Sequence, residues 1–162
     1  MITDSETDYV YLSGLLPERH PRFFKFLTEA LRAKDIGYGL LEYTNDIWCR
    51  DYMPVQTVRG FVQFRYDPGY LKSKKYRALR TDPSMVCASI GITPVRTDIV
   101  VDGGNVVMSR YKAVMTDRIF KENPQYSRVS LVKKITRLLG VREVVVIPCC
   151  AFDTFGHADG MI

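Results

Sequence analysis

The sequence predicts an α/β fold, and three observations support this prediction. Segments with helical periodicity alternate along the chain with short runs rich in β-branched and aromatic residues. Glycine, proline and polar residues separate these segments. Polar, glycine-bearing loops recur at a regular interval, since Asp51 and Asp102 are 51 residues apart (102 − 51) and Asp102 and His157 are 55 apart (157 − 102). We therefore expect a repeated α/β unit of about fifty residues.

The first half of the chain is predicted to form a helix, a strand and a hairpin. Residues 21–34 place apolar side chains at helical spacing ahead of Gly37, which is typical of the end of an amphipathic helix. A strand is expected at residues 38–43. Residues 52–58 and 61–66 are separated by Arg59 and Gly60, a pattern that predicts a β-hairpin.

The second half repeats this order with variations. We expect a short helix at residues 83–90 and strands at 93–101, 106–109 and 113–116. Residues 127–139 form a second strong helical pattern that Gly140 ends, with an apolar stripe predicted to face the core. This stripe consists of Val129, Val132, Ile135, Leu138 and Leu139. A buried strand is expected at residues 143–148.

Length and composition indicate a soluble protein with a single domain over residues 1–162. The chain is 46% hydrophobic and 25% charged, which is enough apolar material for one core. Its longest apolar runs are far shorter than the roughly 20 residues of a membrane-spanning helix. The N-terminal segment with Thr3, Asp4, Ser5, Glu6 and Asp8 is the reverse of a secretory signal, so we expect a cytoplasmic location and no membrane partner.

The formal charge of +5 comes largely from one stretch of five cations. These are Lys72, Lys74, Lys75, Arg77 and Arg80. A solvated loop explains this run, and an anionic partner is the alternative interpretation. Nucleic-acid binding would show aromatic platforms among the basic residues or a known motif, and only scattered tyrosines are present. We therefore expect no nucleic-acid partner.

The first polar loop, residues 45–54, concentrates chemistry in a short segment. Asp46, Trp48, Arg50 and Asp51 lie together immediately ahead of a predicted strand. A structural interpretation pairs Arg50 with Asp46 and places Trp48 in the core. A functional interpretation makes the loop part of a binding site.

The second and third loops, residues 101–107 and 153–160, have comparable features. Asp102 precedes Gly103 and Gly104, which allow close approach of the backbone or form a tight hairpin turn. His157 and Asp159 point to the same side of an extended segment, so an acid–base group and a carboxylate could face one cavity. A metal site would need a third ligand, and His20, the other histidine, lies in a proline-flanked surface segment, so we expect no metal.

The three loops together resemble agmatine deiminase and its arginine deiminase relatives. The resemblance rests on Trp48-x-Arg50-Asp51 with Pro54, on an acid before Gly103-Gly104, and on Asp153-Thr154-x-Gly156-His157-x-Asp159. It runs from about Asn45 to the last residue. It implies a pentein fold, which is a five-bladed α/β propeller around one channel, without metal or organic cofactor. About three of the five ββαβ-type modules are expected here, at approximately residues 1–67, 68–118 and 119–162.

The resemblance also implies roles for individual residues. Asp51 and Asp159 correspond to carboxylates that hold a substrate guanidinium, Asp102 to the acid of the second loop, and His157 to the general acid/base. Trp48 is expected to form part of the channel wall. The chemistry fits, because a planar guanidinium presents paired N–H donors to carboxylates. Three buried acids would also repel each other until a cation arrives.

Two departures from the family pattern bear on activity. Asp102 stands where the closest relatives usually carry glutamate, so its reach is shorter by one methylene. The nucleophilic cysteine of the family lies near the C-terminus of the catalytic domain, beyond the equivalent of Ile162. Among the four cysteines, Cys49 is the alternative nucleophile because Arg50 could lower its pKa. Cys87, Cys149 and Cys150 are predicted to be buried, inert thiols, and no disulfide is expected.

These features favour a hydrolase that converts agmatine to N-carbamoylputrescine and ammonia, as in putrescine biosynthesis and polyamine metabolism, with this chain an inactive N-terminal portion. An arginine or protein-arginine deiminase is one alternative. A non-catalytic guanidinium-binding or interaction module is another. The expected partners are a small guanidinium compound such as agmatine and a second copy of the chain in a homo-oligomer, because an open propeller exposes apolar module faces.

Overall fold

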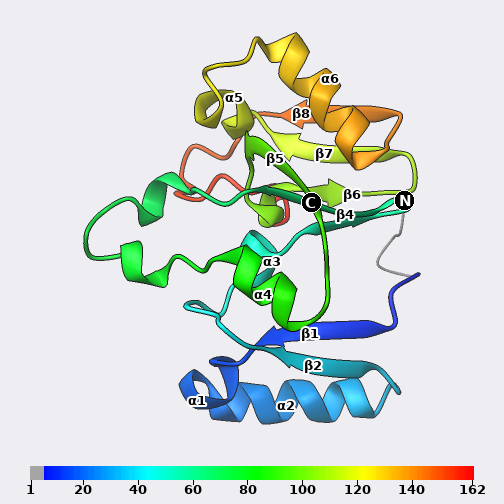
Figure 1. The fold of residues 1–162 in the computed structure, drawn as a ribbon, viewed down its shortest axis with the longest axis vertical. Coiled ribbons are helices and arrows are strands. Elements are labelled where there is room, and N and C mark those ends of the chain that lie inside the picture. The colour runs from blue at the N-terminus through cyan, green and yellow to red at the C-terminus, as the bar shows by residue number, and fades with distance from the viewer. Residues whose placement is uncertain (1–5) are drawn as a thin grey trace.

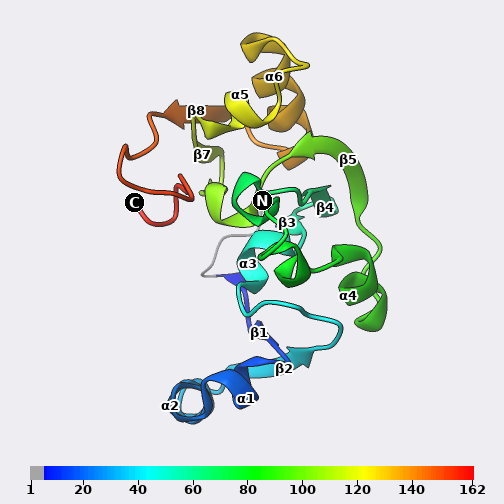
Figure 2. The same cartoon turned by 90° about the vertical axis from the view of Figure 1, so that its left-hand side faces the viewer.

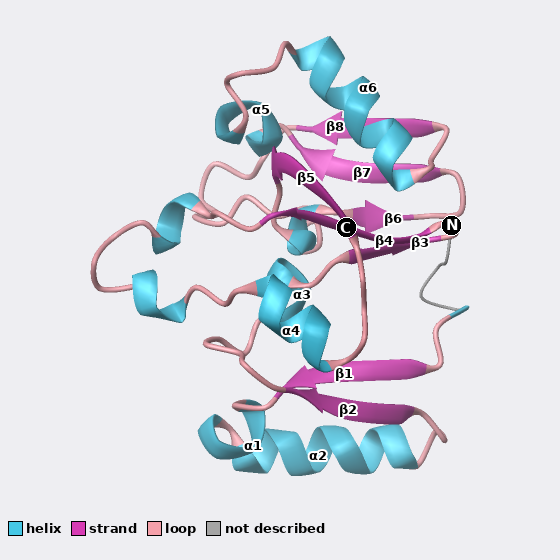
Figure 3. Ribbon diagram, in the orientation of Figure 1, coloured by secondary structure: helices cyan, strands magenta, loops and turns pink. Residues whose placement is uncertain are grey.

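The computed structural model describes residues 6–162 and shows a mixed α/β protein with three small sheets (Figure 1). The sheets have the strand orders β1-β2, β3-β4-β5 and β6-β7-β8, so each is formed by consecutive strands. Helix α2 lies at one end of the molecule and α6 at the other (Figure 3). The predicted α/β class is confirmed. Thr3, Asp4 and Ser5, on which part of the argument against a secretory signal rests, lie outside the described residues.

The first unit is a parallel strand pair joined by helices. Its elements are β1 (Tyr9–Ser13), α1 (Leu16–Arg19), α2 (Pro21–Arg32) and β2 (Gly37–Leu41). Strands β1 and β2 pair in register from Tyr9 opposite Gly37 to Ser13 opposite Leu41. The two glycines at 37 and 39 leave room for aromatic rings, because a Cβ atom at Gly37 would lie 2.8 Å from the ring of Tyr9. Strand β1 and helix α1 were not predicted from the sequence.

The second unit adds an antiparallel strand to the same arrangement. Its elements are β3 (Val55–Thr57), β4 (Gly60–Arg65), α4 (Pro83–Ser89) and β5 (Val95–Val100). Thr57 pairs with Gly60 across the turn, which confirms the predicted hairpin. Asp82 caps α4 by accepting the amide of Ser84, and β5 then runs parallel to β4. The connection between β4 and α4 contains two short 3₁₀ turns, η2 (Gly69–Leu71) and η3 (Arg77–Leu79).

The third unit repeats this order with longer elements. Its elements are β6 (Val107–Met108), β7 (Lys112–Thr116), α5 (Arg118–Glu122), α6 (Arg128–Leu139) and β8 (Glu143–Ile147). The predicted ends of α6 are confirmed. Ser127 accepts the amide of Ser130 at the first turn, and Gly140 at φ 67° forms the left-handed C-cap.

The three units do not coincide with the predicted modules. Sheet β3-β4-β5 takes its strands from both sides of the boundary expected between residues 67 and 68. Strands β7 and β8 likewise lie on either side of the boundary expected between 118 and 119. In both cases the expected boundary falls in a connection between two strands of one sheet: the basic connection and α4 join β4 to β5, and α5 and α6 join β7 to β8.

Two apolar clusters hold the units together. Leu41 at the end of β2 packs with Tyr52, which precedes β3, and with Val86 of α4, and all three are completely buried. A larger cluster joins the second and third units, and in it α6 contributes the buried face of Leu131, Ile135 and Leu139. Burial of each such side chain contributes about 2 kcal/mol.

The predicted apolar stripes are only partly buried. On α2, Phe23 is 55% exposed and Phe26 is 69% exposed, because a two-stranded sheet covers only one side of the helix. On α6, Val129 is 78% exposed and Leu131 occupies the buried face in its place. Figure 2 shows α2, α4 and α6 at the periphery of the molecule and the C-terminal segment on the side away from α4. In the described part of the chain, no helix is long and apolar enough to cross a membrane.

Candidate active site

Each of the three polar loops follows the last strand of a unit. The first follows β2 and contains the single-turn helix α3 (Cys49–Tyr52), the second follows β5 and contains the 3₁₀ turn η4 (Gly103–Asn105), and the third follows β8. Because the units share the same strand order, equivalent loops meet at one place. Asp51, Asp102, His157 and Asp159, which are far apart in the sequence, are brought together there.

The imidazole of His157 lies between two carboxylates. Its Nε2 is 3.2 Å from Asp102 Oδ2, and its Nδ1 is 3.6 Å from Asp51 Oδ1. The ring is largely buried, and Asp102 is only 2% exposed. A protonated ring can therefore donate to one carboxylate while it forms an ion pair with the other.

Gly104 is at the centre of this cluster. A Cβ atom there would lie 2.6 Å from His157 Nδ1, 2.7 Å from Asp51 Oδ1 and 3.0 Å from Asp159 Oδ2. The backbone of Gly104 also connects the loops, because its amide donates to Asp51 Oδ1 over 3.1 Å and its carbonyl accepts the amide of Asp159 over 3.1 Å. The glycines of the second loop thus allow three loops to approach one another closely. The alternative interpretation, a tight hairpin turn, is wrong.

Arg50 bridges the first and second loops. Its Nε donates to the carbonyl of Gly103 over 3.2 Å and its Nη2 to that of Val106 over 2.7 Å. The alternative pairing of Arg50 with Asp46 is therefore wrong. A Cβ atom at Gly103 would overlap the carbonyl oxygen of Arg50, so the two loops can pack this closely only with glycine at position 103.

A cavity of about 540 Å³ opens onto the cluster. Asp51, His157 and Asp159 line it, and so do Asp46 and Arg50. The rest of its wall is aromatic or apolar and consists of Trp48, Tyr66, Tyr70, Leu71, Tyr76, Leu79 and Phe155, together with Thr154. Trp48 is 64% exposed, which rules out the alternative that placed it in the core.

Most of the aromatic wall was missed from the sequence. Tyr70 and Phe155 meet edge to face with ring centroids 4.9 Å apart, although they come from different units. Tyr76 belongs to the basic connection, whose cations are exposed as expected of a solvated loop. The signal that could have revealed the wall is the recurrence of tyrosine at 66, 70 and 76, ahead of that run and within it.

Burial and mutual repulsion shape the electrostatics of the cluster. Burial raises the pKa of Asp51 from 3.8 to about 6, with the negative charges of Asp102 and Asp159 adding to it and His157 opposing it. Burial lowers the pKa of His157, but the hydrogen bond to Asp102 and the three nearby carboxylates outweigh it, so the pKa of His157 is raised. The site therefore favours a protonated histidine and resists accumulating further negative charge.

Asp102 reaches the histidine despite its short side chain. One carboxylate oxygen accepts from His157, whereas the other, Oδ1, is buried without a hydrogen-bond partner among residues 6–162. An unpaired buried carboxylate oxygen is costly and indicates a site that a further donor would complete.

None of the four cysteines lines this cavity. Burial raises the pKa of Cys49, which disfavours the thiolate that the neighbouring Arg50 was considered to promote. Cys87 is buried as predicted. The prediction that Cys149 and Cys150 are buried is wrong, because the segment after β8 runs along the surface and both are exposed.

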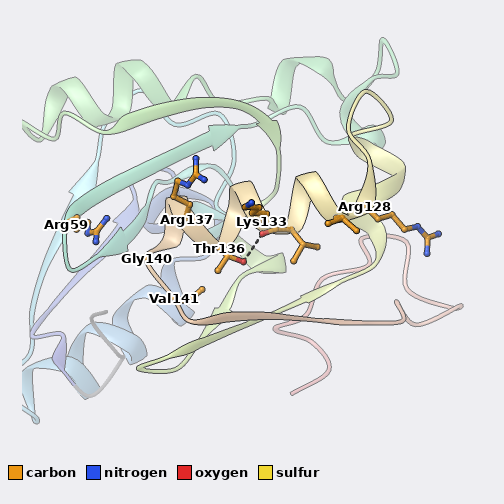
Figure 4. A pocket seen from close by; sticks show the side chains of 9 residues that line it. Arg59, Arg128, Lys133, Thr136, Arg137, Gly140 and Val141 are labelled. Carbon is orange, nitrogen blue, oxygen red and sulfur yellow. Dashed lines mark hydrogen bonds between the residues drawn. The ribbon is translucent and has the colours of Figure 1, made fainter.

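Other parts of the surface have different chemistry. Within residues 6–162, no group of three His, Cys, Asp or Glu side chains is arranged to hold a metal ion. A groove of about 800 Å³ along α6 is rimmed by four cations, Arg59, Arg128, Lys133 and Arg137, and no carboxylate lines it (Figure 4). Repulsion from these four charges disfavours a cationic ligand in the groove, so of these two cavities the one at the acid cluster is the candidate site for a cation.

Comparisons with known proteins show the family and the fold of this chain. The model of the Porphyromonas-type peptidyl-arginine deiminase family matches residues 28–162, and the chain belongs to this family. The agmatine and peptidyl-arginine deiminases of this group are hydrolases that act on guanidino groups. No curated protein matches the chain significantly.

Solved structures of such deiminases have a similar fold. An agmatine deiminase from C. jejuni is 15% identical, with a TM-score of 0.67 over 93% of this chain and 56% of its own. A protein from Porphyromonas gingivalis, described as an arginine deiminase, is 18% identical, with a TM-score of 0.67 over 93% and 58%. A protein described as a peptidyl-arginine deiminase is 14% identical, with a TM-score of 0.72 over 98% and 60%.

At such identities the likeness shows the fold and not the activity. The chain is a mixed α/β protein similar to the pentein-fold deiminases. It spans between 43% and 60% of the length of the matched structures.

Proposed function

We propose that the acid cavity binds a guanidinium group and that the protein's activity is hydrolysis of a guanidinium C–N bond. The observation that carries this proposal is the convergence of Asp51, Asp159 and His157 on Gly104, beside a cavity with aromatic walls. Asp102 completes the cluster from behind the His157 ring. A guanidinium supplies what the cluster lacks, because it is a permanent planar cation with paired N–H donors. Aromatic rings along the cavity suit the rest of such a cation.

The roles follow from position. Asp51 and Asp159 border the cavity and would accept the guanidinium N–H groups, while Asp102 lies behind His157 and would hold the ring in place. His157 is placed to give a proton to the departing ammonia and to take one from the attacking water. The nucleophile in this chemistry is a thiolate that attacks the central carbon and forms a covalent thiouronium intermediate.

We infer agmatine as the substrate, and the charges of the cavity wall support this choice. Arg50 is the only arginine or lysine in the described cavity wall, and its guanidinium donates to the carbonyls of Gly103 and Val106. The protonated ring of His157 also lines the cavity, but it faces Asp102 and Asp51. The α-carboxylate of free arginine would therefore find no free cation there, whereas the wall offers Asp46 to an amine. A protein-arginine deiminase is the second candidate, since a peptide-linked arginine also lacks that carboxylate.

The 162-residue chain is expected to bind such a ligand without hydrolysing it. In the described residues no cysteine borders the cavity, so an attacking thiolate would have to come from elsewhere. A cysteine-to-serine variant of the C. jejuni agmatine deiminase has substrate bound, which supports binding without the thiol. This behaviour corresponds to the non-catalytic binding module considered from the sequence.

The repeated units support a partial propeller. Strand pairs β1-β2, β4-β5 and β7-β8 are each parallel and joined through a helix, and β3 and β6 add an antiparallel strand in the second and third units. We infer three modules whose boundaries follow the sheets, near residues 48 and 101.

The incomplete first unit supports self-association. Strand β1 has the place that β4 and β7 occupy in their sheets, but in the described structure only β2 pairs with it. Its open edge can form an antiparallel pair with the same edge of a second copy. The exposed Phe23 and Phe26 on α2 add apolar surface near this unit.

The test is calorimetric titration of the 162-residue chain with agmatine, free arginine and a peptide that contains arginine. We expect agmatine to bind, Asp51→Asn and Asp159→Asn to abolish binding, and Asp98→Asn to leave it unchanged. Asp98 is a suitable control because it is an exposed acid that pairs with Lys134. Ammonia release is measured in parallel. Absence of agmatine binding would refute the proposed site, and ammonia release by this chain would show that one of its own thiols reacts.

A further inference from the structure

Thr116, which ends β7, and the two residues that follow it each form a hydrogen bond with the segment between β8 and His157. Thr116 Oγ1 donates to the carbonyl of Gly156 over 2.6 Å. Asp117 Oδ1 accepts the amide of Cys149 over 3.0 Å. Arg118 Nη1 donates to the carbonyl of Thr154 over 2.7 Å. These bonds join positions 32 to 40 residues apart, so they set tertiary geometry.

Thr116 is the most deeply placed of the three. Its side chain is completely buried, and its amide donates to Asn105 Oδ1 over 2.8 Å. Asn105 belongs to η4, next to Gly104. One residue therefore holds the second loop through its amide and the third loop through its hydroxyl.

Arg118 is held in place by a partner of its own. Its Nε donates to Glu122 Oε1 over 2.7 Å, and the two side chains are 19% and 12% exposed. Its stem packs against Gly156, because a Cβ atom there would lie 3.0 Å from Arg118 Cδ. Gly156 has φ 62°, a conformation that favours glycine, so the loop turns sharply at the point where Arg118 covers it.

The turn leads directly to His157. Asp153 orders the inside of the loop by accepting the amides of Phe155 and His157 over 2.9 and 3.3 Å. These bonds within the loop do not determine the position of the loop relative to Asp102. The carbonyls of Thr154 and Gly156 flank Phe155 and are the points at which β7 and α5 fix it.

We propose that Thr116 and Arg118 are positioning residues, which hold the third loop through the carbonyls of Gly156 and Thr154 and thereby place the His157 ring against Asp102 and Asp51. Neither residue lines the acid cavity in the described structure, so neither touches a ligand there. The inference goes beyond guanidinium binding, because it concerns how the site is assembled and can be tested without substrate.

The experiment compares three variants of the 162-residue chain. Thr116→Val removes the donor with little change in shape, and Thr116→Ser keeps it. Thr57→Val is the matched control, because Thr57 is also buried and donates to a glycine carbonyl, that of Gly60 over 2.9 Å, in the hairpin of the second unit.

Two readouts report on the loop. The first is the proton NMR titration of His157, which faces the carboxylates of Asp51, Asp102 and Asp159 and is one of two histidines in the chain. The second is hydrogen exchange of the Gly104 and Asp159 amides, which connect the loops.

For Thr116→Val we expect the His157 midpoint to move down toward its ordinary value of 6.5. We expect the two amides to exchange about tenfold faster, as loss of one buried hydrogen bond predicts. Thr116→Ser should behave as the unmodified chain, and Thr57→Val should leave both readouts unchanged.

Two results would overturn the proposal. One is an unchanged His157 titration in Thr116→Val; the other is an equal change in Thr57→Val, which would indicate general destabilisation. If Thr116→Val does not fold, Arg118→Lys tests the same point, because one ammonium cannot span both Thr154 and Glu122 as the guanidinium does. Arg118→Lys is then expected to lower the His157 midpoint in the same way, and an unchanged midpoint would again overturn the proposal.

Discussion

Replacement of Asp51 by asparagine should stabilise the folded chain at neutral pH while it removes guanidinium binding. Asp51 is buried beside two further carboxylates, and its pKa is raised from 3.8 to about 6, mainly by burial. Asparagine retains an oxygen that can accept the amide of Gly104, as Asp51 Oδ1 does over 3.1 Å. The substitution therefore removes the buried charge and keeps the hydrogen bond.

The sign and size of the change in unfolding free energy follow from proton linkage. Between pH 3.8 and about 6, the folded state binds more protons at Asp51 than the unfolded state does, so this residue's contribution to stability is lost as the pH rises through that range. The difference of about two pKa units corresponds to about 3 kcal/mol. Asp51→Asn should thus match the unmodified chain near pH 4 and exceed its unfolding free energy by up to about 3 kcal/mol at pH 7.5.

Urea denaturation at pH 4.0, 5.5 and 7.5 measures this difference. Asp98→Asn is the control: hydrogen bonds from Tyr126 and Lys134 lower the pKa of that exposed carboxyl, so its removal should give no gain at pH 7.5. If Asp51→Asn were less stable than the unmodified chain at pH 7.5, or if the gain did not depend on pH, the assignment of Asp51 as a destabilised buried acid would be wrong.

Four other substitutions test separate parts of the structure. Gly104→Ala should weaken agmatine binding at least about tenfold in calorimetry, because the methyl group would enter the space between three site side chains; unchanged affinity would mean that the ligand lies elsewhere. Asp102→Asn should lower the pKa of His157 measured by NMR, since the charge that hydrogen-bonds to the ring is removed, and an unchanged value would contradict that contact. Gly140→Ala should cost about 1 kcal/mol in urea denaturation, because the C-cap of α6 has φ 67°, whereas a neutral result would mean that the cap relaxes. Tyr11→Pro should reduce self-association in light scattering more than Tyr11→Ala does, because proline removes a backbone amide from the open edge of β1. Amides along a strand point alternately to its two sides, and the Gly14 amide points to β2, so the Tyr11 amide, three residues away, points to the open edge. Equal effects would show that the edge is not the contact.

Local patterns predicted the elements whose causes are local. The hairpin at Arg59-Gly60 and the helix between Ser127 and Gly140 depend on turn and cap residues that neighbour them in the sequence. Strand β1 escaped prediction because its stability comes from pairing with β2, across two intervening helices. The exposure of Phe23 and Val129 was also missed, since periodicity shows which side of a helix is apolar but not how much of that side a partner covers.

The sequence by itself determined the α/β class, the family, and the residues that form the candidate site. The reason is that glycines, acids and a histidine at these spacings restrict both the backbone conformation and the possible chemistry, and this restriction can be recognised in the sequence alone. Only the tertiary structure decided how these residues meet. It showed Arg50 bound to two carbonyls of the second loop, and an aromatic wall to which the basic connection contributes Tyr70 and Tyr76. It also showed Cys149 and Cys150 at the surface and outside the lining of the acid cavity. The physical reason is that each of these features depends on contacts between units about fifty residues apart, whose relative placement is set by packing of whole sheets and not by any local preference.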